Sequence, residues 1–222
     1  MFLELDGVLT PQEIQRLRAL AKGARFADGR LSNPHSQVKN NQQIDHADPA
    51  YAEAAQLMAA ALQRHEDFRN FAYPRVVAPP MLARYAPGAN YGLHTDAAFL
   101  PLGQRPMRSD LSCTIFIAAQ GDYEGGELSI QLGTRQVLFK GAPGVAIVYP
   151  STTLHEVLAV SAGERLVGLT FIESRIADPV LRELLFNLDE VAALEGLRMQ
   201  PENRTRLDYV RNNLLRMWGG RD

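Results

Sequence analysis

The chain has 222 residues, of which 46% are hydrophobic and 22% charged, and its formal net charge is −2. This length and composition predict one globular domain, with room for a small appendage, and exclude a disordered, collagen-like or disulfide-rich chain. The weak net charge gives no global attraction to nucleic acid or to an anionic membrane.

The single cysteine, Cys113, excludes an internal disulfide and fits a reducing compartment. The N-terminal residues MFLELDGVLTPQE carry acidic side chains where a signal peptide would need a basic start and an apolar run. No apolar run is long enough to span a bilayer. We therefore expect a soluble cytoplasmic protein that binds neither membranes nor nucleic acid.

Two helices are predicted near the N-terminus. The segment Thr10-Pro11-Gln12-Glu13 has a capping residue, a proline at the first helical position and a capping-box glutamate, which predict a helix that ends near Gly23. Residues 28–48 are polar and indicate an extended loop or irregular strand. Apolar side chains at helical spacing then predict a helix over about 49–65.

From about residue 72 the apolar spacing is typical of strands. Many short strands broken by glycine and proline favour an antiparallel sandwich or barrel over alternating β-α units. The polar segment 100–110 is predicted to be a connection that could cover a site. Strands are expected at 81–85, 111–119, 127–131, 136–139, 145–149 and 166–173.

After Ser174 the pattern is helical again, at 179–194 and 201–218. The predicted fold is therefore α+β, with N-terminal helices packed on a β core and a helical C-terminal extension. The expected regions are 1–75 for support, 76–175 for the core and 176–222 for the extension. The apolar stripes of the extension should pack on the core or form a homodimer interface.

Two of the five histidines, His94 and His155, lie in the predicted β region. His94 and Asp96 are two positions apart in an extended segment, so both side chains project to one side and can approach one metal ion. Two imidazoles and one carboxylate leave coordination positions open, as in iron(II) oxygenases that admit a co-substrate and O₂. Alone, the H-x-D pair is a weak signal.

The other histidines, His35, His46 and His65, lie in helical or polar surroundings and are predicted to be structural or surface groups. His35 and His46 could still edge a substrate cleft.

Arg165 precedes the last apolar strand. A guanidinium that enters a barrel needs an anion, because an unpaired buried charge is costly. A dicarboxylate bound to the metal at one end could offer its distal carboxylate to Arg165.

The segment Arg84–Asp96, RYAPGANYGLHTD, resembles the metal motif of prolyl 4-hydroxylase-like oxygenases, and the turn 124–128 and the His155…Arg165 pair continue the pattern. The whole chain resembles the bacterial PKHD-type hydroxylases. The resemblance implies a double-stranded β-helix, or jelly roll, with Fe(II) bound by His94, Asp96 and His155. It also implies 2-oxoglutarate as co-substrate, paired with Arg165, and ascorbate to keep the iron reduced.

The resemblance places Tyr85 in the lining of the co-substrate pocket, although a tyrosine packed in the barrel core is an equal alternative. Phe116 is a departure, because related prolyl hydroxylases often have a tyrosine on this strand. Thr114 or Thr170 could supply the missing hydroxyl, or the pocket could do without it.

The implied reaction hydroxylates a C–H bond and releases succinate and CO₂, with no catalytic residue beyond the metal centre. The alternatives are a non-catalytic, metal-binding cupin-like module and a zinc hydrolase. Arg165 argues against the first, and the H-x-D…H order followed by arginine favours iron over zinc. The substrate stays open between a protein side chain, prolyl or lysyl, and a small molecule related to iron uptake.

Overall fold

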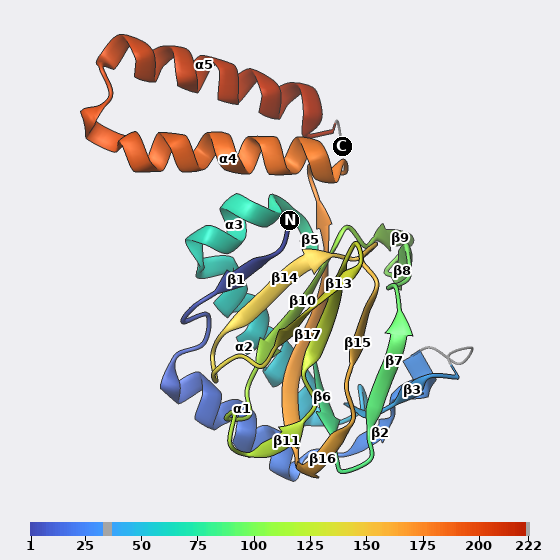
Figure 1. Cartoon of the computed structure of the whole chain (residues 1–222). Helices are drawn as coiled ribbons and strands as arrows, with labels where there is room; N and C mark the ends of the chain where they lie inside the picture. The colour runs from blue at the N-terminus through green and yellow to red at the C-terminus, as the bar shows by residue number, and fades with distance from the viewer. Residues whose placement is uncertain (33–36, 221–222) are drawn as a thin grey trace.

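The computed structural model describes residues 1–32 and 37–220, so His35 lies outside the described residues. Two antiparallel sheets face each other, helices cover the outside of one sheet, and a helical hairpin stands at one end of the molecule (Figure 1). This arrangement confirms the predicted α+β jelly roll. No helix in the described ranges is both long and apolar enough to cross a membrane.

The N-terminal helices follow the predicted signals. Helix α1 (Pro11–Gly23) starts with the expected capping box, in which the Thr10 hydroxyl accepts from the Glu13 amide and the Glu13 carboxylate accepts from the Thr10 amide. Helix α2 (Pro49–Arg64) lies where the second helix was predicted, and it is followed at once by α3 (Glu66–Ala72), which was not predicted.

The larger sheet has eight strands, and all six residues of its strand β10 (Leu111–Phe116) are buried. Burial on both sides is expected because α1 and α2 cover the outer face while the second sheet covers the inner face. Met58 of α2, for example, packs directly on the backbone of Gly168. The strands are β1 (Leu3–Leu5), β14 (Ala146–Pro150), β10 (Leu111–Phe116), β17 (Arg165–Ser174), β6 (Met81–Tyr85), β4 (Gln42–Ile44) and β2 (Phe26–Asp28), in spatial order, with β5 (Pro74–Val77) beside β17.

The smaller sheet faces this core and carries the two histidines of the β region. Its strands are, in spatial order, β13 (Arg135–Phe139), β12 (Leu128–Leu132), β15 (His155–Val157), β7 (Asn90–His94) and β3 (Lys39–Asn40). A short ribbon of β11 (Tyr123–Gly125) and β16 (Val160–Gly163) lies at one end.

The segment predicted to be a polar connection forms a hairpin instead. Strands β8 (Phe99–Leu102) and β9 (Arg105–Arg108) pair with Leu102 opposite Arg105, which leaves a two-residue loop. Gly103 has a φ of 63°, the left-handed conformation that such tight hairpin loops favour in glycine. Sequence reasoning missed this hairpin because each strand contains a proline, Pro101 and Pro106, and proline within a short run argues against a strand.

The C-terminal hairpin consists of α4 (Pro179–Glu195) and α5 (Pro201–Trp218). Phe186 of α4 packs edge-on against Phe71 of α3, with ring centres 5.3 Å apart. Helix α5 lies on α4 and buries none of its described side chains. The extension is therefore attached to the core through α4.

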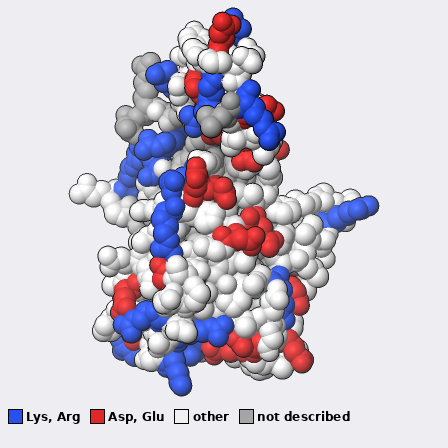
Figure 2. Space-filling model, turned by 90° about the vertical axis from the view of Figure 1, so that its left-hand side faces the viewer, with Lys and Arg blue, Asp and Glu red and all other residues white. Residues whose placement is uncertain are grey.

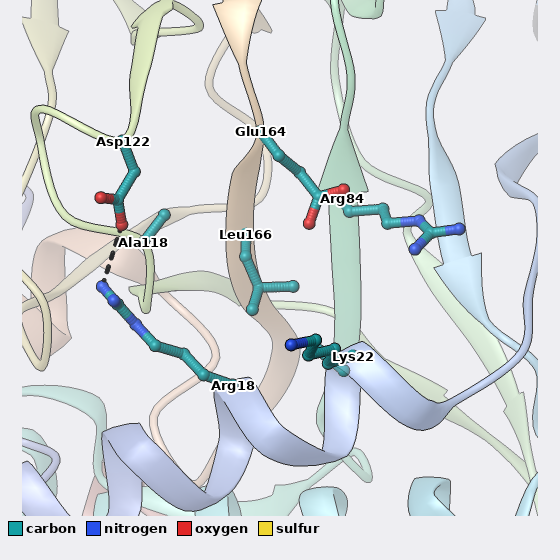
Figure 3. A pocket seen from close by; sticks show the side chains of 8 residues that line it. Arg18, Lys22, Arg84, Ala118, Asp122, Glu164 and Leu166 are labelled. Atoms are coloured by element: carbon teal, nitrogen blue, oxygen red, sulfur yellow. Dashed lines mark ion pairs between the residues drawn. The ribbon is translucent and has the colours of Figure 1, made fainter.

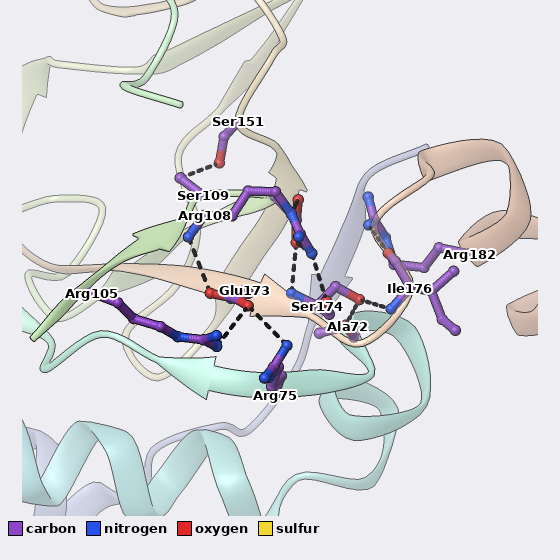
Figure 4. A network of polar contacts seen from close by, with 11 residues as sticks. Ala72, Arg75, Arg105, Arg108, Ser109, Ser151, Glu173, Ser174, Ile176 and Arg182 are labelled. Atoms are coloured by element: carbon purple, nitrogen blue, oxygen red, sulfur yellow. Dashed lines mark hydrogen bonds and ion pairs between the residues drawn. The ribbon is translucent and has the colours of Figure 1, made fainter. Parts of the chain in front are cut away.

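A polar network anchors the end of β17 below this hairpin (Figure 4). The buried Glu173 accepts from the Arg108 amide at 3.1 Å and lies within 3.7 Å of the guanidinium groups of Arg75 and Arg105. Ser174 donates its hydroxyl to the Ala72 carbonyl at 2.7 Å. These bonds hold the last core strand against α3, from which the chain turns into α4.

Candidate active site

The pairing of β7 with β15 places His94 directly opposite His155, with ring centres 4.3 Å apart. Asp96 follows β7, and its amide donates to the Ser151 carbonyl at 3.2 Å. One ligand atom from each of the three side chains lies within 4.8 Å of the others. Three residues that are distant in sequence thus converge at a distance compatible with one metal ion.

Both imidazoles present the same nitrogen to the centre of this group. The Nδ1 atoms of His94 and His155 donate to the carbonyls of Gly92 and Thr153, at 2.7 and 2.9 Å, because a carbonyl can only accept. The Nε2 atoms therefore keep their lone pairs and lie 3.8 and 3.6 Å from the Asp96 carboxylate. Such backbone acceptors commonly fix the tautomer of histidines that bind metals.

The surroundings favour an uncharged His94. Burial lowers the pKa of His94, and the neighbouring His155 lowers it further. Tyr91 stacks on the His94 ring at 3.6 Å and holds its plane. A neutral, oriented imidazole is the form that binds metal.

A chain of buried serines supports the Asp96 carboxylate. The Ser112 hydroxyl donates to Oδ2 of Asp96 at 2.5 Å, and it also bonds the Ser151 hydroxyl at 2.8 Å. Ser151 in turn bonds Ser109 at 2.8 Å, as Figure 4 shows. These serines were not predicted, because isolated serines form no motif and meet only when β10 pairs with β14.

Arg165 is 1% exposed, and none of its three guanidinium nitrogens has a hydrogen-bond acceptor among the described residues. Gly126, with a φ of 68°, leaves room for the arginine, since a Cβ atom there would lie 3.1 Å from its Cδ. A buried guanidinium without an acceptor is costly, so the arrangement calls for an anion. Its planar set of donors matches a carboxylate.

Tyr85 and Asn41 lie beside this arginine. The β6–β17 register pairs Tyr85 with Arg165. Asn41 lies on the other side of Tyr85 in the same row, just before Gln42, which pairs with Arg84 on β6. Burial raises the pKa of Tyr85, while Arg165 and then Asn41 oppose the rise. Asn41 is 5% exposed, and its amide nitrogen and oxygen both lack a hydrogen-bond partner of good geometry. The position of Asn41 was not predicted, because it lies in a segment without periodicity.

Phe116 has no hydroxyl, although the centre of its ring lies 6.0 Å from the Arg165 guanidinium. Thr170 donates to the Ala78 carbonyl at 2.6 Å, so its hydroxyl is engaged outside the pocket. Thr114 lies beside Tyr149, where burial raises the pKa of the phenol and the Thr114 hydroxyl only partly opposes the rise.

The remaining described histidines have other contacts. His46 stacks on Tyr51 at 4.2 Å, and Nε2 of His65 lies 3.0 Å from the Asp6 carbonyl. Neither contact involves the group around Asp96.

A separate surface pocket of about 410 Å³ lies between α1 and the β6–β17 edge (Figure 3). Arg18 and Asp122 form an ion pair of 3.2 Å at its side, and Leu166 forms part of its lining. The pocket contains none of the three converging ligand residues, and its Arg18 is bound to Asp122 and to the Ile117 carbonyl. It is therefore distinct from the candidate active site.

Residues 80–173 match the family model of the 2OG-Fe(II) oxygenase superfamily. A PKHD-type hydroxylase of Sphingopyxis alaskensis is 51% identical over 215 residues, which cover 97% of this chain and 98% of that protein. This chain belongs to the PKHD-type hydroxylases. A second member, from Thermosynechococcus vestitus, is 38% identical and covers 98% of this chain and 99% of its own.

Two solved structures have the same fold. A prolyl-4-hydroxylase of Pseudomonas putida aligns with a TM-score of 0.54 at 20% identity, over 78% of this chain and 92% of its own. A prolyl hydroxylase of Trichoplax adhaerens aligns with a TM-score of 0.58 at 16% identity, over 77% and 83%. This PKHD-type hydroxylase is thus an Fe(II)- and 2-oxoglutarate-dependent dioxygenase, as predicted, with 2-oxoglutarate and O₂ as co-substrates.

Proposed function

We propose that His94, Asp96 and His155 bind the Fe(II) ion that this class of enzyme requires. The convergence of their ligand atoms and the free Nε2 atoms of both histidines support this assignment. When bound, the metal and 2-oxoglutarate supply the oxidising chemistry. The protein's own part is to hold three ligands on one side and to leave the other side open.

Arg165 is proposed to bind the distal carboxylate of 2-oxoglutarate. The observation that carries this proposal is a fully buried guanidinium without an acceptor. Tyr85 is proposed to line the same pocket, since it pairs with Arg165 across the sheet. Asn41, at the end of that row, is proposed to add an amide to the pocket. Together they would orient the co-substrate and exclude water from its tail.

The substrate is proposed to be a protein side chain or a small molecule related to iron uptake, with succinate and CO₂ as co-products. Ascorbate is proposed to keep the iron reduced. Acidic and basic side chains are mixed over the face in Figure 2, which gives no support for nucleic acid as a partner. We also propose that the protein is cytoplasmic and forms a homodimer. Its proposed regions are 1–75 for support, 76–175 for the β core and 176–222 for the helical extension.

The test is succinate formation by the purified enzyme with Fe(II), 2-oxoglutarate and a cell extract, coupled to a search for any molecule that gains one oxygen atom. Succinate formed only with Fe(II), and a product one oxygen heavier, are expected. Metal binding without any 2-oxoglutarate turnover would contradict the proposed roles.

A further inference from the structure

Large apolar side chains are unusually exposed on the C-terminal hairpin. Fifteen such side chains are exposed in the described part of the chain, and seven of them lie on α4 and α5. The hairpin contributes only the residues from Pro179 to Trp218, so the concentration is local. Contiguous apolar surface of this kind marks interaction sites. The seven are Val180, Leu184, Val191, Leu194, Tyr209, Val210 and Met217.

The exposed residues of α4 follow the spacing of a coiled-coil seam. One narrow stripe of α4 contains the exposed residues Val180, Leu184, Asn187, Val191 and Leu194. Successive members are four and three residues apart in alternation, which is the spacing of a coiled-coil seam. A polar asparagine in such a seam commonly specifies register. The opposite side of α4 packs on α3 through Phe186, so this stripe is a second packing face.

Helix α5 extends this face. It packs on α4 through Leu214, Leu215 and Trp218, which cover a small cluster that includes Leu185. The two helices are antiparallel, and the helical period places Val210 and Met217 on the same flank of the hairpin as the α4 stripe. The hairpin therefore presents a two-helix apolar face without a covering element in the described chain.

Charges beside this face indicate what covers it. Exposed Glu190 borders the α4 stripe, as does Glu183, which pairs with the N-terminal amine of its own chain at 3.2 Å, and exposed Arg206 lies within a turn of Val210 on α5. If α4 met another α4, these glutamates would face each other. If α4 met α5 of a second copy, acidic side chains would face basic ones, which is the complementary arrangement.

The axial positions fit the second arrangement. Within one chain Asp189 is paired with Arg211, so these residues lie at the same level along the hairpin. A two-fold axis parallel to the helices preserves that level. Glu190 of one copy would then lie about 6 Å along the axis from Arg206 of the other, within reach of both side chains.

We infer that this face binds a second copy of the chain in an antiparallel four-helix bundle, with α4 of each copy against α5 of the other. The two-fold arrangement buries both stripes at once, as expected for an isologous dimer. The bundle lies on the hairpin and involves none of the residues proposed to bind Fe(II) or 2-oxoglutarate. This inference rests on the proposed homodimer, and its failure would leave the roles proposed for the residues that bind Fe(II) and 2-oxoglutarate untouched.

The experiment measures the dimer dissociation constant of the full chain by analytical ultracentrifugation. The wild type is expected to dimerise, and Leu184→Glu is expected to be monomeric because it buries an unpaired charge in the seam. Leu138→Glu serves as the matched control, since Leu138 is 55% exposed on β13 of the smaller sheet, outside the hairpin. Its dissociation constant should equal that of the wild type.

A charge reversal tests the arrangement of the helices without threatening the fold, because both side chains are exposed. Glu190→Arg and Arg206→Glu should each weaken the dimer about tenfold, and the double variant should recover most of the loss. A wild type that sediments as a monomer at every concentration would overturn the proposal. A dimer insensitive to Leu184→Glu, or a double variant weaker than both single ones, would equally do so.

Discussion

Arg165 and Tyr85 occupy paired positions on β17 and β6, and the arginine guanidinium lies 4.9 Å from the centre of the tyrosine ring. The aromatic face is favourable for a cation but offers no acceptor for its N–H groups. The polar side chains of Arg165 and Asn41 on this row are buried without hydrogen-bond partners among the described residues, and their N–H donors match a carboxylate. This relationship is the strongest structural support for a carboxylate-binding pocket beside the converging histidines.

Arg165→Ala should weaken 2-oxoglutarate binding, measured by calorimetry, by about thirtyfold to several thousandfold, which corresponds to roughly 2–5 kcal/mol for loss of one partner of a buried charge pair. Arg165→Lys should also weaken it, because lysine lacks the planar fork. Metal affinity without co-substrate should stay unchanged. Arg84→Ala is the control, since Arg84 lies on the outer face and bonds Gln42. Unaltered 2-oxoglutarate affinity in Arg165→Ala would refute the assigned role.

His155→Ala and His94→Ala should abolish binding of Fe(II) while the circular dichroism spectrum stays that of the wild type, since the β7–β15 pairing uses backbone bonds. Asp96→Ala should behave nearly the same. His46→Ala serves as the control, because His46 stacks on Tyr51 and has no contact with the group around Asp96. Wild-type affinity for Fe(II) in the His155 variant would show that the ligand assignment is wrong.

Ser112→Ala should lower the affinity for Fe(II) about tenfold to a hundredfold, the usual loss when a residue that orients a metal ligand is removed. The reason is that Ser112 donates to Oδ2 of Asp96 and so holds the carboxylate in one orientation. Ser109→Ala, two hydroxyls further from the carboxylate, should have a much smaller effect. The Fe(II) affinity of both variants is measured by titration calorimetry, and their melting temperatures by thermal unfolding. If the two serines only contributed to packing, both variants would lose melting temperature equally.

Asn41→Asp should weaken 2-oxoglutarate binding more than Asn41→Ala does. A carboxylate at the end of the Tyr85–Arg165 row would repel the co-substrate and compete with it for the guanidinium, whereas alanine only removes a donor. The measurement is co-substrate affinity at constant metal concentration. If Asn41→Asp lowered only thermal stability, Asn41 would belong to the packing of the core and not to the pocket.

Deletion of residues 176–222 should give an unstable or insoluble protein, because it uncovers Phe71 and Tyr73 and removes the buried Ile176 and Leu185. Deletion from residue 200 onward removes only α5, none of whose described side chains is itself buried. It uncovers part of the cluster around Leu185 but leaves Ile176, Leu185 and Phe186 in place, so it should lower the melting temperature less. Thermal unfolding of both truncated chains measures the difference. Equal melting temperatures for the longer truncation and the full chain would contradict the packing described for α4.

Several features could be predicted because their causes are local. The capping box at Thr10 and Glu13 starts α1 where the residues themselves supply both hydrogen bonds. The H-x-D spacing puts His94 and Asp96 on one side of an extended chain, whatever the chain packs against. The period of the apolar residues similarly separates the helical flanks from the β core.

Other features depend on which distant segments become neighbours. His155 meets His94 only through the β7–β15 register, and a shift of one residue would turn its ring to the other face of the sheet. The contact of Ser112 with Asp96, the row from Asn41 to Arg165 and the unpaired state of that guanidinium all arise when the two sheets close on each other. Local periodicity cannot specify such contacts, because register and burial are set by packing across the whole barrel.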